Sequence, residues 1–199
     1  KNIFTFGHSK KASQLEGSKD FMKKLCKDFN IPTAEYESFD NLLKAQDFIK
    51  KSKHPLVIKS DGLAAGKGVT ISNNVEESIK CTKEILEGKF KTSSKVVIEE
   101  FLEGEEASYF VITDGENYLP IGTAQDHKRI GENDTGLNTG GMGAYSPSLL
   151  ITNDMQEKIN KKIIEPTIKS LNTIGCSFVG ILYAGLMIKN NEPKQNLRK

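Results

Sequence analysis

The chain has 199 residues, and its 28 lysines and arginines nearly balance its 26 aspartates and glutamates, leaving a formal net charge of +2. With 37% hydrophobic residues it can bury a core, which argues against a disordered tail. No apolar run approaches the ~20 residues of a membrane span and no secretory leader opens the sequence, so we expect a cytoplasmic protein with neither membrane nor nucleic-acid partners.

Two helices and one extended stretch are predicted before Pro55. Ser18 can cap a helix that runs to about Asn30, because apolar residues follow it at helical spacing. Residues 34–39 are typical of an extended stretch, and Asp40 can cap a second helix that ends before Pro55.

The next segment predicts two strands and a helix. Residues 56–59 and 69–71 are strand candidates, and a glycine-rich loop joins them over residues 60–68. Asn74 can cap the helix that follows, and Gly88 closes it.

Strand signals dominate the middle of the chain. Residues 96–102 and 106–113 are rich in β-formers, and the turn signal Asp114-Gly115 leads into a strand over 118–125. Residues 126–147 show no periodicity and hold five of the chain's 17 glycines, which favours a long functional loop.

Near the end of the chain, Thr152 can cap a long amphipathic helix that is bent or interrupted at Pro166. Residues 178–188 are almost continuously apolar, as in a strand buried on both faces. The whole order of elements predicts an α+β fold of two lobes. The larger lobe begins with residues 1–32, the small lobe spans 33–98, and residues 99–199 return to the larger lobe.

The strongest chemical signal is the loop after residues 56–59. That strand ends on Lys59, and Lys67 follows between Gly66 and Gly68. Glycines let backbone amides approach phosphate oxygens, and two ammonium groups neutralise a polyphosphate, so the pattern favours nucleotide binding. Its spacing fits neither a Walker A loop nor the dinucleotide fingerprint. The alternative is a tight hairpin whose glycines serve only the turn.

A second signal is the acidic end of the strand at residues 96–102. By itself, an acidic strand end is more typical of a solvated edge. Beside the lysine loop, the same strand end can offer backbone groups to an adenine edge and a carboxylate to ribose hydroxyls.

A third signal runs through residues 125–143. Asp126, Lys128 and Arg129 form a charged cluster, and the glycines after them can fold over a ligand. The alternatives are a flexible surface loop and, for His127, a hydrogen-bonded loop histidine rather than a substrate contact.

Metal-ligand spacing is absent from the sequence. The cysteines at 26, 81 and 176 and the histidines at 8, 54 and 127 lie far apart. We therefore expect the cysteines to act as small hydrophobic residues and this chain to supply no metal ligand.

The sequence closely resembles the phosphoribosylamine–glycine ligases, which are ATP-grasp enzymes of purine biosynthesis. The matching text runs in family order: LEGSK (15–19), IPTA (31–34), KSDGLAAGKGV (59–69), EEFLEGEEAS (99–108), QDHKR (125–129) and NTGGMGAYSP (138–147). The combination is specific for these ligases, whereas the lysine–glycine loop alone would indicate only an ATP-grasp protein.

The resemblance implies an ATP-grasp fold with the nucleotide between two lobes, and it implies roles for particular residues. ATP would be bound by Lys19, Lys59, Gly66, Lys67, Gly68, Glu99, Glu100, Phe101, Leu102 and Glu106. The substrates would be bound by Asp126, His127, Lys128, Arg129, Asn138, Thr139, Gly140, Gly141 and Met142. The implied catalytic groups are Lys59, Lys67 and Arg129.

The implied reaction has two steps and joins glycine to 5-phosphoribosylamine. Glycine's carboxylate attacks the γ-phosphate of ATP, and the amine then displaces phosphate from the glycyl phosphate.

Mg²⁺ is the implied second cofactor, but the text after Lys194 departs from the family pattern. We therefore expect its ligands beyond the end of this chain and little turnover from residues 1–199 alone. The alternatives are another ATP-grasp carboxylate–amine ligase and a catalytically incomplete ATP-binding fragment; the oligomeric state stays open.

Overall fold

A computed structural model describes residues 6–62, 64, 68–90, 94–132 and 135–196, with backbone alone at 128, 129, 135, 137, 138 and 140. The chain divides into two compact units. The small unit comprises residues 14–24 and 33–102, and the large unit comprises residues 6–13, 25–32 and 103–196. The lobe boundaries expected at residues 33 and 99 stay a prediction.

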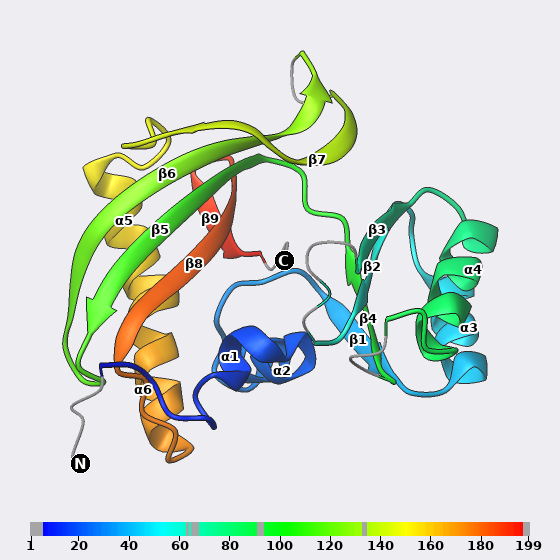
Figure 1. Cartoon of the computed structure of the whole chain (residues 1–199), viewed down its shortest axis with the longest axis horizontal. Coiled ribbons are helices and arrows are strands. Elements are labelled where there is room, and N and C mark those ends of the chain that lie inside the picture. Colours follow the sequence, from blue (N-terminus) through cyan, green and yellow to red (C-terminus); the bar gives the residue numbers. More distant parts are fainter. Residues whose placement is uncertain (1–5, 63, 65–67, 91–93, 133–134, 197–199) are drawn as a thin grey trace. The chain divides into compact units, whose positions relative to one another are not determined.

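The small unit is built on a four-stranded antiparallel sheet with the strand order β1-β4-β2-β3. Two helices, α3 and α4, lie side by side and pack against this sheet (Figure 1). Their shared core is made of Ala45, Ile49, Leu56, Ile58, Ile85, Val96 and Ile98. The elements of the unit are α1 (Gln14–Gly17), α2 (Lys19–Asp28, whose last turn enters the large unit), β1 (Tyr36–Phe39), α3 (Leu42–Lys51), β2 (Leu56–Ser60), β3 (Val69–Ser72), α4 (Val75–Leu86) and β4 (Val96–Glu100).

Side-chain caps fix where the small unit's helices begin. The Ser18 hydroxyl accepts the N–H of Phe21 at 3.1 Å, and the Asn74 side chain accepts that of Glu77 at 2.9 Å, so both predicted caps are confirmed. The predicted cap at Asp40 is wrong. Asn41, one residue later, is in the extended conformation that a cap requires and accepts the N–H of Lys44 at 3.1 Å.

The large unit is built on a five-stranded antiparallel sheet with the order β7-β6-β5-β8-β9. Alternation along β5 buries Ala107, Tyr109 and Val111 on one face. Figure 1 shows the continuous helix α5–η1–α6 lying along the sheet. The elements are β5 (Glu105–Thr113), β6 (Tyr118–Gly131), β7 (Thr135–Tyr145), α5 (Asn153–Ile159), η1 (Asn160–Ile164), α6 (Glu165–Thr173), β8 (Gly180–Lys189) and β9 (Glu192–Gln195).

The long helix of the large unit widens in its middle rather than ending. Thr152 caps it as predicted, accepting the N–H of Met155 at 3.3 Å. The irregularity expected at Pro166 lies just ahead of it, where η1 is a π-helical segment. Its buried residues are Met155, Ile159, Ile163, Ile164, Ile168, Ser170 and Leu171, and the step of five from Ile159 to Ile164 matches the wider turn.

A hairpin that was not predicted ends the large unit. Strand β9 pairs with β8, and Asn190 and Asn191 between them have φ of 51° and 61°. Positive φ at both central residues is the signature of a type I′ turn, which asparagine tolerates well. None of the helices in the described part of the chain has the length and apolar character that crossing a bilayer would require.

Candidate functional site: a buried lysine cluster

Lys59 and Glu99 lie on the face of the small sheet that does not carry the α3–α4 core. The register pairs Ile58 with Ile98, and both belong to that core. Neighbouring residues on a strand point to opposite faces, so Lys59 and Glu99 share the other face as diagonal neighbours on β2 and β4. Lys59 Nζ is 2.9 Å from Glu99 Oε2, and the side chains are 1% and 3% exposed.

Lys23 is a third member of this group, and the sequence interpretation missed it. It extends from α2, with Nζ 3.3 Å from the same Glu99 Oε2, and its side chain is 1% exposed. Its ammonium also donates to Thr33 Oγ1 at 2.9 Å and to the carbonyl oxygen of Ala34 at 2.7 Å. The available signal was a second lysine one helical turn after Lys19, which places both on one face of α2.

Lys23, Glu99 and Lys59 form what we call the buried triad. Two ammonium groups share one carboxylate, so the triad carries a formal charge of +1 in a buried position. Glu99 Oε1 is buried and has no hydrogen-bond partner within the described part of the chain. Buried charge of one sign is costly unless compensated, so the triad is suited to attract an anion.

Lys19 ties the start of α2 to the loop after β2. It is 4% exposed, and its Nζ donates to the carbonyl oxygen of Gly62 at 2.8 Å. In the same loop, Asp61 accepts the Ser18 hydroxyl and the backbone N–H of Asp20, each at 3.2 Å. Burial lowers the pKa of the Lys19 ammonium, while Asp61 acts in the opposite direction and Lys59 adds to the lowering.

The glycine-rich loop is described only in part. Gly66 and Lys67 lie outside the described residues, so their predicted contacts with phosphate stay predictions. Gly68 is described, and its carbonyl oxygen accepts the N–H of Ser60 at 2.8 Å. A Cβ built at this glycine would lie 2.7 Å from the Cβ of Ala64, so the backbone here passes closer than any side chain would allow.

The residues expected to hold adenine and ribose fall in different units. Glu100 ends β4 half-buried, and its backbone N–H donates to the carbonyl oxygen of Glu35 at 2.9 Å. Phe101 and Leu102 follow it and are half-buried. Glu106, the expected ribose acceptor, lies half-buried on β5 in the large unit. The roles of these four residues stay predictions.

The long loop expected over residues 126–147 is wrong, because most of it is strand. Strands β6 and β7 pair antiparallel, with Asp126 opposite Ala144 and Arg129 opposite Asn138, and the register shifts twice. The glycines and the exposed side chains of β7 remove the alternation by which a half-buried strand is recognised. Register shifts further disrupt a period of two.

This hairpin carries all the residues expected to contact substrate. The side chains of Lys128, Arg129 and Asn138, together with Gly140, lie outside the described part. Among the others, Asp126 is half-buried, His127 is exposed with its ring 5.8 Å from that of Tyr145, and Met142 is 59% exposed. The Thr139 hydroxyl accepts the N–H of Gly141 at 3.0 Å. Their binding roles stay predictions.

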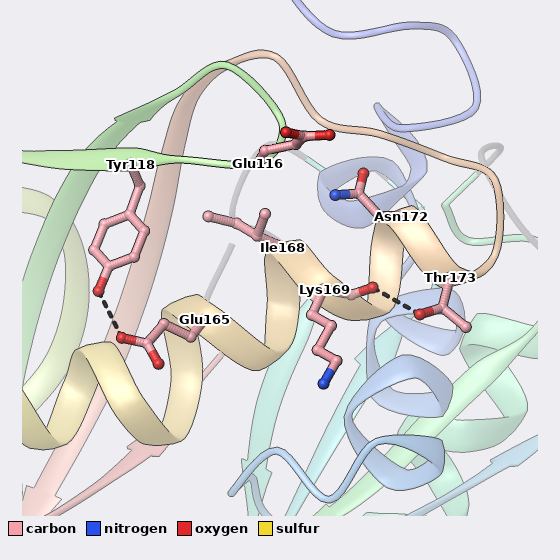
Figure 2. Close-up of a pocket in the computed structure, with 7 residues that line it drawn as sticks. All are labelled: Glu116, Tyr118, Glu165, Ile168, Lys169, Asn172 and Thr173. Atoms are coloured by element: carbon pink, nitrogen blue, oxygen red, sulfur yellow. Dashed lines mark hydrogen bonds between the residues drawn. The ribbon is translucent and has the colours of Figure 1, made fainter.

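A separate hollow of about 410 Å³ opens in the large unit where the β5–β6 turn meets α6 (Figure 2). The Tyr118 hydroxyl donates to Glu165 Oε1 at 2.9 Å. Burial, followed by the hydrogen bond to Glu165 and then its charge, raises the pKa of Tyr118 to about 12. No residue with a predicted role is among those lining it, which are Glu116, Tyr118, Glu165, Ile168, Lys169, Asn172 and Thr173.

Known proteins resemble this chain over almost its whole length. Residues 17–196 match the family described as phosphoribosylglycinamide synthetase, ATP-grasp (A) domain. The chloroplastic phosphoribosylamine–glycine ligase of Arabidopsis thaliana is 52% identical over 199 residues, which are 99% of this chain and 37% of that protein. The phosphoribosylamine–glycine ligase of Brucella melitensis is 51% identical, covering 96% of this chain and 45% of its own length. The chain thus spans less than half the length of these two curated relatives.

Solved structures agree on the fold. The crystal structure of phosphoribosylamine–glycine ligase from Thermotoga maritima has a TM-score of 0.87 and 36% identity, covering 96% of this chain and 49% of that one. D-alanine–D-alanine ligase from Bacillus anthracis, at 21% identity and a TM-score of 0.66, shares the fold alone and covers 96% of this chain and 58% of that one. The predicted α+β ATP-grasp fold is confirmed.

Proposed function

Because the chain belongs to the family of phosphoribosylglycinamide synthetase ATP-grasp domains, we propose that it is part of an ATP-dependent ligase of purine biosynthesis that joins glycine to 5-phosphoribosylamine. The names of the relatives and the identity near one half support this substrate pair. The observation that carries the nucleotide assignment is the buried triad, because its net positive charge matches a polyphosphate.

The proposed reaction is a two-step transfer. A carboxylate oxygen of glycine attacks the γ-phosphorus of ATP, the bond to the bridging oxygen breaks, and ADP leaves. The amine nitrogen of phosphoribosylamine then attacks the acyl carbon of glycyl phosphate, loses a proton and expels inorganic phosphate. The protein contributes position and charge rather than a covalent intermediate. In this scheme Lys19 and Lys59 hold the phosphates, while Gly68 lets the loop backbone approach them.

The buried lysines of the described part fit a polyphosphate, and the metal ion that would accompany it stays a proposal. No cluster of three or more His, Cys, Asp or Glu side chains that could hold a metal occurs among the side chains the structure describes. Mg²⁺ is therefore the proposed second cofactor. A cytoplasmic location is likewise part of the proposal.

Nucleotide binding is tested first, on residues 1–199. ATP should raise the melting temperature of the wild-type chain. Lys59→Met should weaken ATP binding about 100-fold, because it removes a buried charge that faces the phosphates. Lys50→Met, an exposed lysine on α3, should leave ATP binding unchanged. Equal ATP affinity in the wild type and in Lys59→Met would refute the assigned phosphate site.

The substrate pair is tested by phosphate release. The assay supplies ATP, Mg²⁺, glycine and 5-phosphoribosylamine, and omits each in turn, for residues 1–199 and for the longest natural polypeptide that contains them. Release that requires both substrates supports the proposal. Release with another carboxylate and amine favours a different ATP-grasp ligase, and ATP binding without release from either polypeptide favours an incomplete binding fragment.

A further inference from the structure

Lys23 is fixed more tightly than a lysine that contacts a ligand needs to be. An ammonium has three N–H donors. Those of Lys23 face three protein oxygens: Thr33 Oγ1, the Ala34 carbonyl and Glu99 Oε2. The ring of Tyr36 lies 5.2 Å from the same nitrogen. With its donors committed to the protein, Lys23 can influence a nucleotide only through its charge and through the carboxylate it shares.

Because Lys23 and Lys59 share the Glu99 carboxylate, Lys23 sets the net charge around Lys59. Without Lys23, Glu99 and Lys59 would form a neutral pair, and the charge of Lys59 would be cancelled for an incoming anion. With Lys23 present, one oxygen serves two ammonium groups at 3.3 and 2.9 Å, and the triad keeps a formal charge of +1. For stability alone, a surplus charge in a buried position is a cost, because burial removes ions from water.

We propose that Lys23 is a positioning residue of the nucleotide site: it holds the Glu99 carboxylate and keeps the triad positive, so that Lys59 remains available to the phosphates. This inference rests on the proposed function. Lys23 does not touch the nucleotide in this scheme. The contribution of Lys23 to ligand affinity should therefore grow with the number of phosphate charges on the ligand. It should be small for a ligand that carries few phosphate charges.

The experiment measures the dissociation constants of ATP and AMP for residues 1–199 and for variants at Lys23. Lys23→Met should weaken ATP about tenfold and AMP less than about threefold, because a lost unit charge acts more strongly on the triphosphate. Lys23→Arg keeps the charge and should recover most of the ATP affinity. Lys24→Met is the matched control, since Lys24 is exposed on the same helix, and it should bind both nucleotides as the wild type does.

A purely structural lysine would give a different result. In that case a folded Lys23→Met would bind ATP and AMP with the wild-type ratio, and the inference would be overturned. Should Lys23→Met fail to fold, Lys23→Gln removes the charge while its amide can still donate to Thr33 and Ala34, and the same loss of ATP preference is expected. If neither variant folds while Lys24→Met does, Lys23 is structural and the inference is wrong.

Failure of this inference is distinguishable from failure of the proposed function. A wild-type chain that binds no ATP contradicts the function itself. Suppose instead that the wild-type chain binds ATP and that Lys59→Met weakens this binding. If Lys23→Met then prefers ATP over AMP as the wild type does, only the role of Lys23 is contradicted.

Discussion

The Nζ atom of Lys19 lies 2.8 Å from the carbonyl oxygen of Gly62, although the two residues are 43 positions apart in the chain. The contact anchors the first turn of α2 to the loop after β2, and Lys19 as a whole residue is almost fully buried. Because burial lowers the pKa of this ammonium, its charge is lost at a lower pH than that of an ordinary lysine.

ATP affinity should therefore fall at alkaline pH. In the proposed nucleotide site the charged form of Lys19 favours phosphate, so ATP binding should be strongest below the lowered Lys19 pKa and should weaken as pH rises through it. Arginine stays charged up to about pH 12, so Lys19→Arg should flatten this profile between about pH 7 and about pH 10. Titration calorimetry with ATP across this pH range measures the pH dependence of ATP affinity, with Lys24→Arg as the control. Parallel profiles for the wild type and Lys19→Arg would contradict the assignment.

Tyr118 should make the stability of the large unit sensitive to strong alkali. Its pKa is raised from 10.0 to about 12, so its contribution is fully present below pH 10.0 and is lost as pH rises towards about 12. Tyr118→Phe should cost about 0.5–1.5 kcal/mol near neutral pH through the lost hydrogen bond. It should also remove the tyrosinate absorbance that develops at about pH 12.

Glu165→Gln separates the effect of burial on the Tyr118 pKa from the effect of the Glu165 carboxylate. Burial is the larger cause and is unchanged by the substitution, so the pKa of Tyr118 should fall only part of the way towards 10.0. Ultraviolet absorbance titrations of the wild type and of Glu165→Gln measure the pKa of Tyr118 in each. A Tyr118 pKa in Glu165→Gln that equals the ordinary value would show that the carboxylate, rather than burial, dominates.

The start of α3 offers a clean comparison of neighbouring residues. Asn41→Ala should lower the free energy of unfolding by about 1 kcal/mol, because the Lys44 N–H loses its acceptor. Asp40→Ala should change it by less than about 0.5 kcal/mol, since Asp40 is exposed and is not the cap. Urea unfolding measures both, and a larger loss from Asp40→Ala would reverse the assignment of the cap.

Gly104, just before β5, should not tolerate a side chain. It has φ of 142°, and a Cβ there would lie 2.5 Å from the carbonyl oxygen of Ile188. Gly104→Ala should therefore destabilise the protein by about 2 kcal/mol or more, combining backbone strain with a clash against a neighbouring strand. Gly17→Ala is the control, because nothing lies within 4 Å of its Cβ and alanine favours helix by up to about 1 kcal/mol. Comparable melting temperatures for the two variants would contradict this prediction.

Local signals in the sequence predicted local structure well. The caps at Ser18, Asn74 and Thr152 each depend on one side chain and a backbone N–H three residues later, so they can be found without knowledge of the fold. The error at Asp40 is a shift of one residue between two good capping types, since the sequence alone does not show which of them accepts the helix N–H.

Long-range features were the ones that could not be predicted. Lys23 reads as an ordinary surface lysine of a helix until the fold brings Glu99 beside it, 76 residues later in the chain. The β6–β7 hairpin was missed because its glycines and exposed side chains erase the period-of-two pattern. The resemblance to known ligases supplied Lys59 and Glu99 of the candidate site, and the geometry added Lys23, which shares the Glu99 carboxylate with Lys59.

The π-helical segment at Asn160–Ile164 holds one residue more than a regular turn, and Asn160 is held there by the Tyr109 hydroxyl at 3.0 Å. In an α-helix each residue adds about 100° of rotation, so a surplus residue absorbed by a widened turn leaves both halves facing the same way. The helix can consequently lose one residue within this segment and become regular α-helix. Its apolar stripe would then keep its phase, and the sheet beneath would keep its cover.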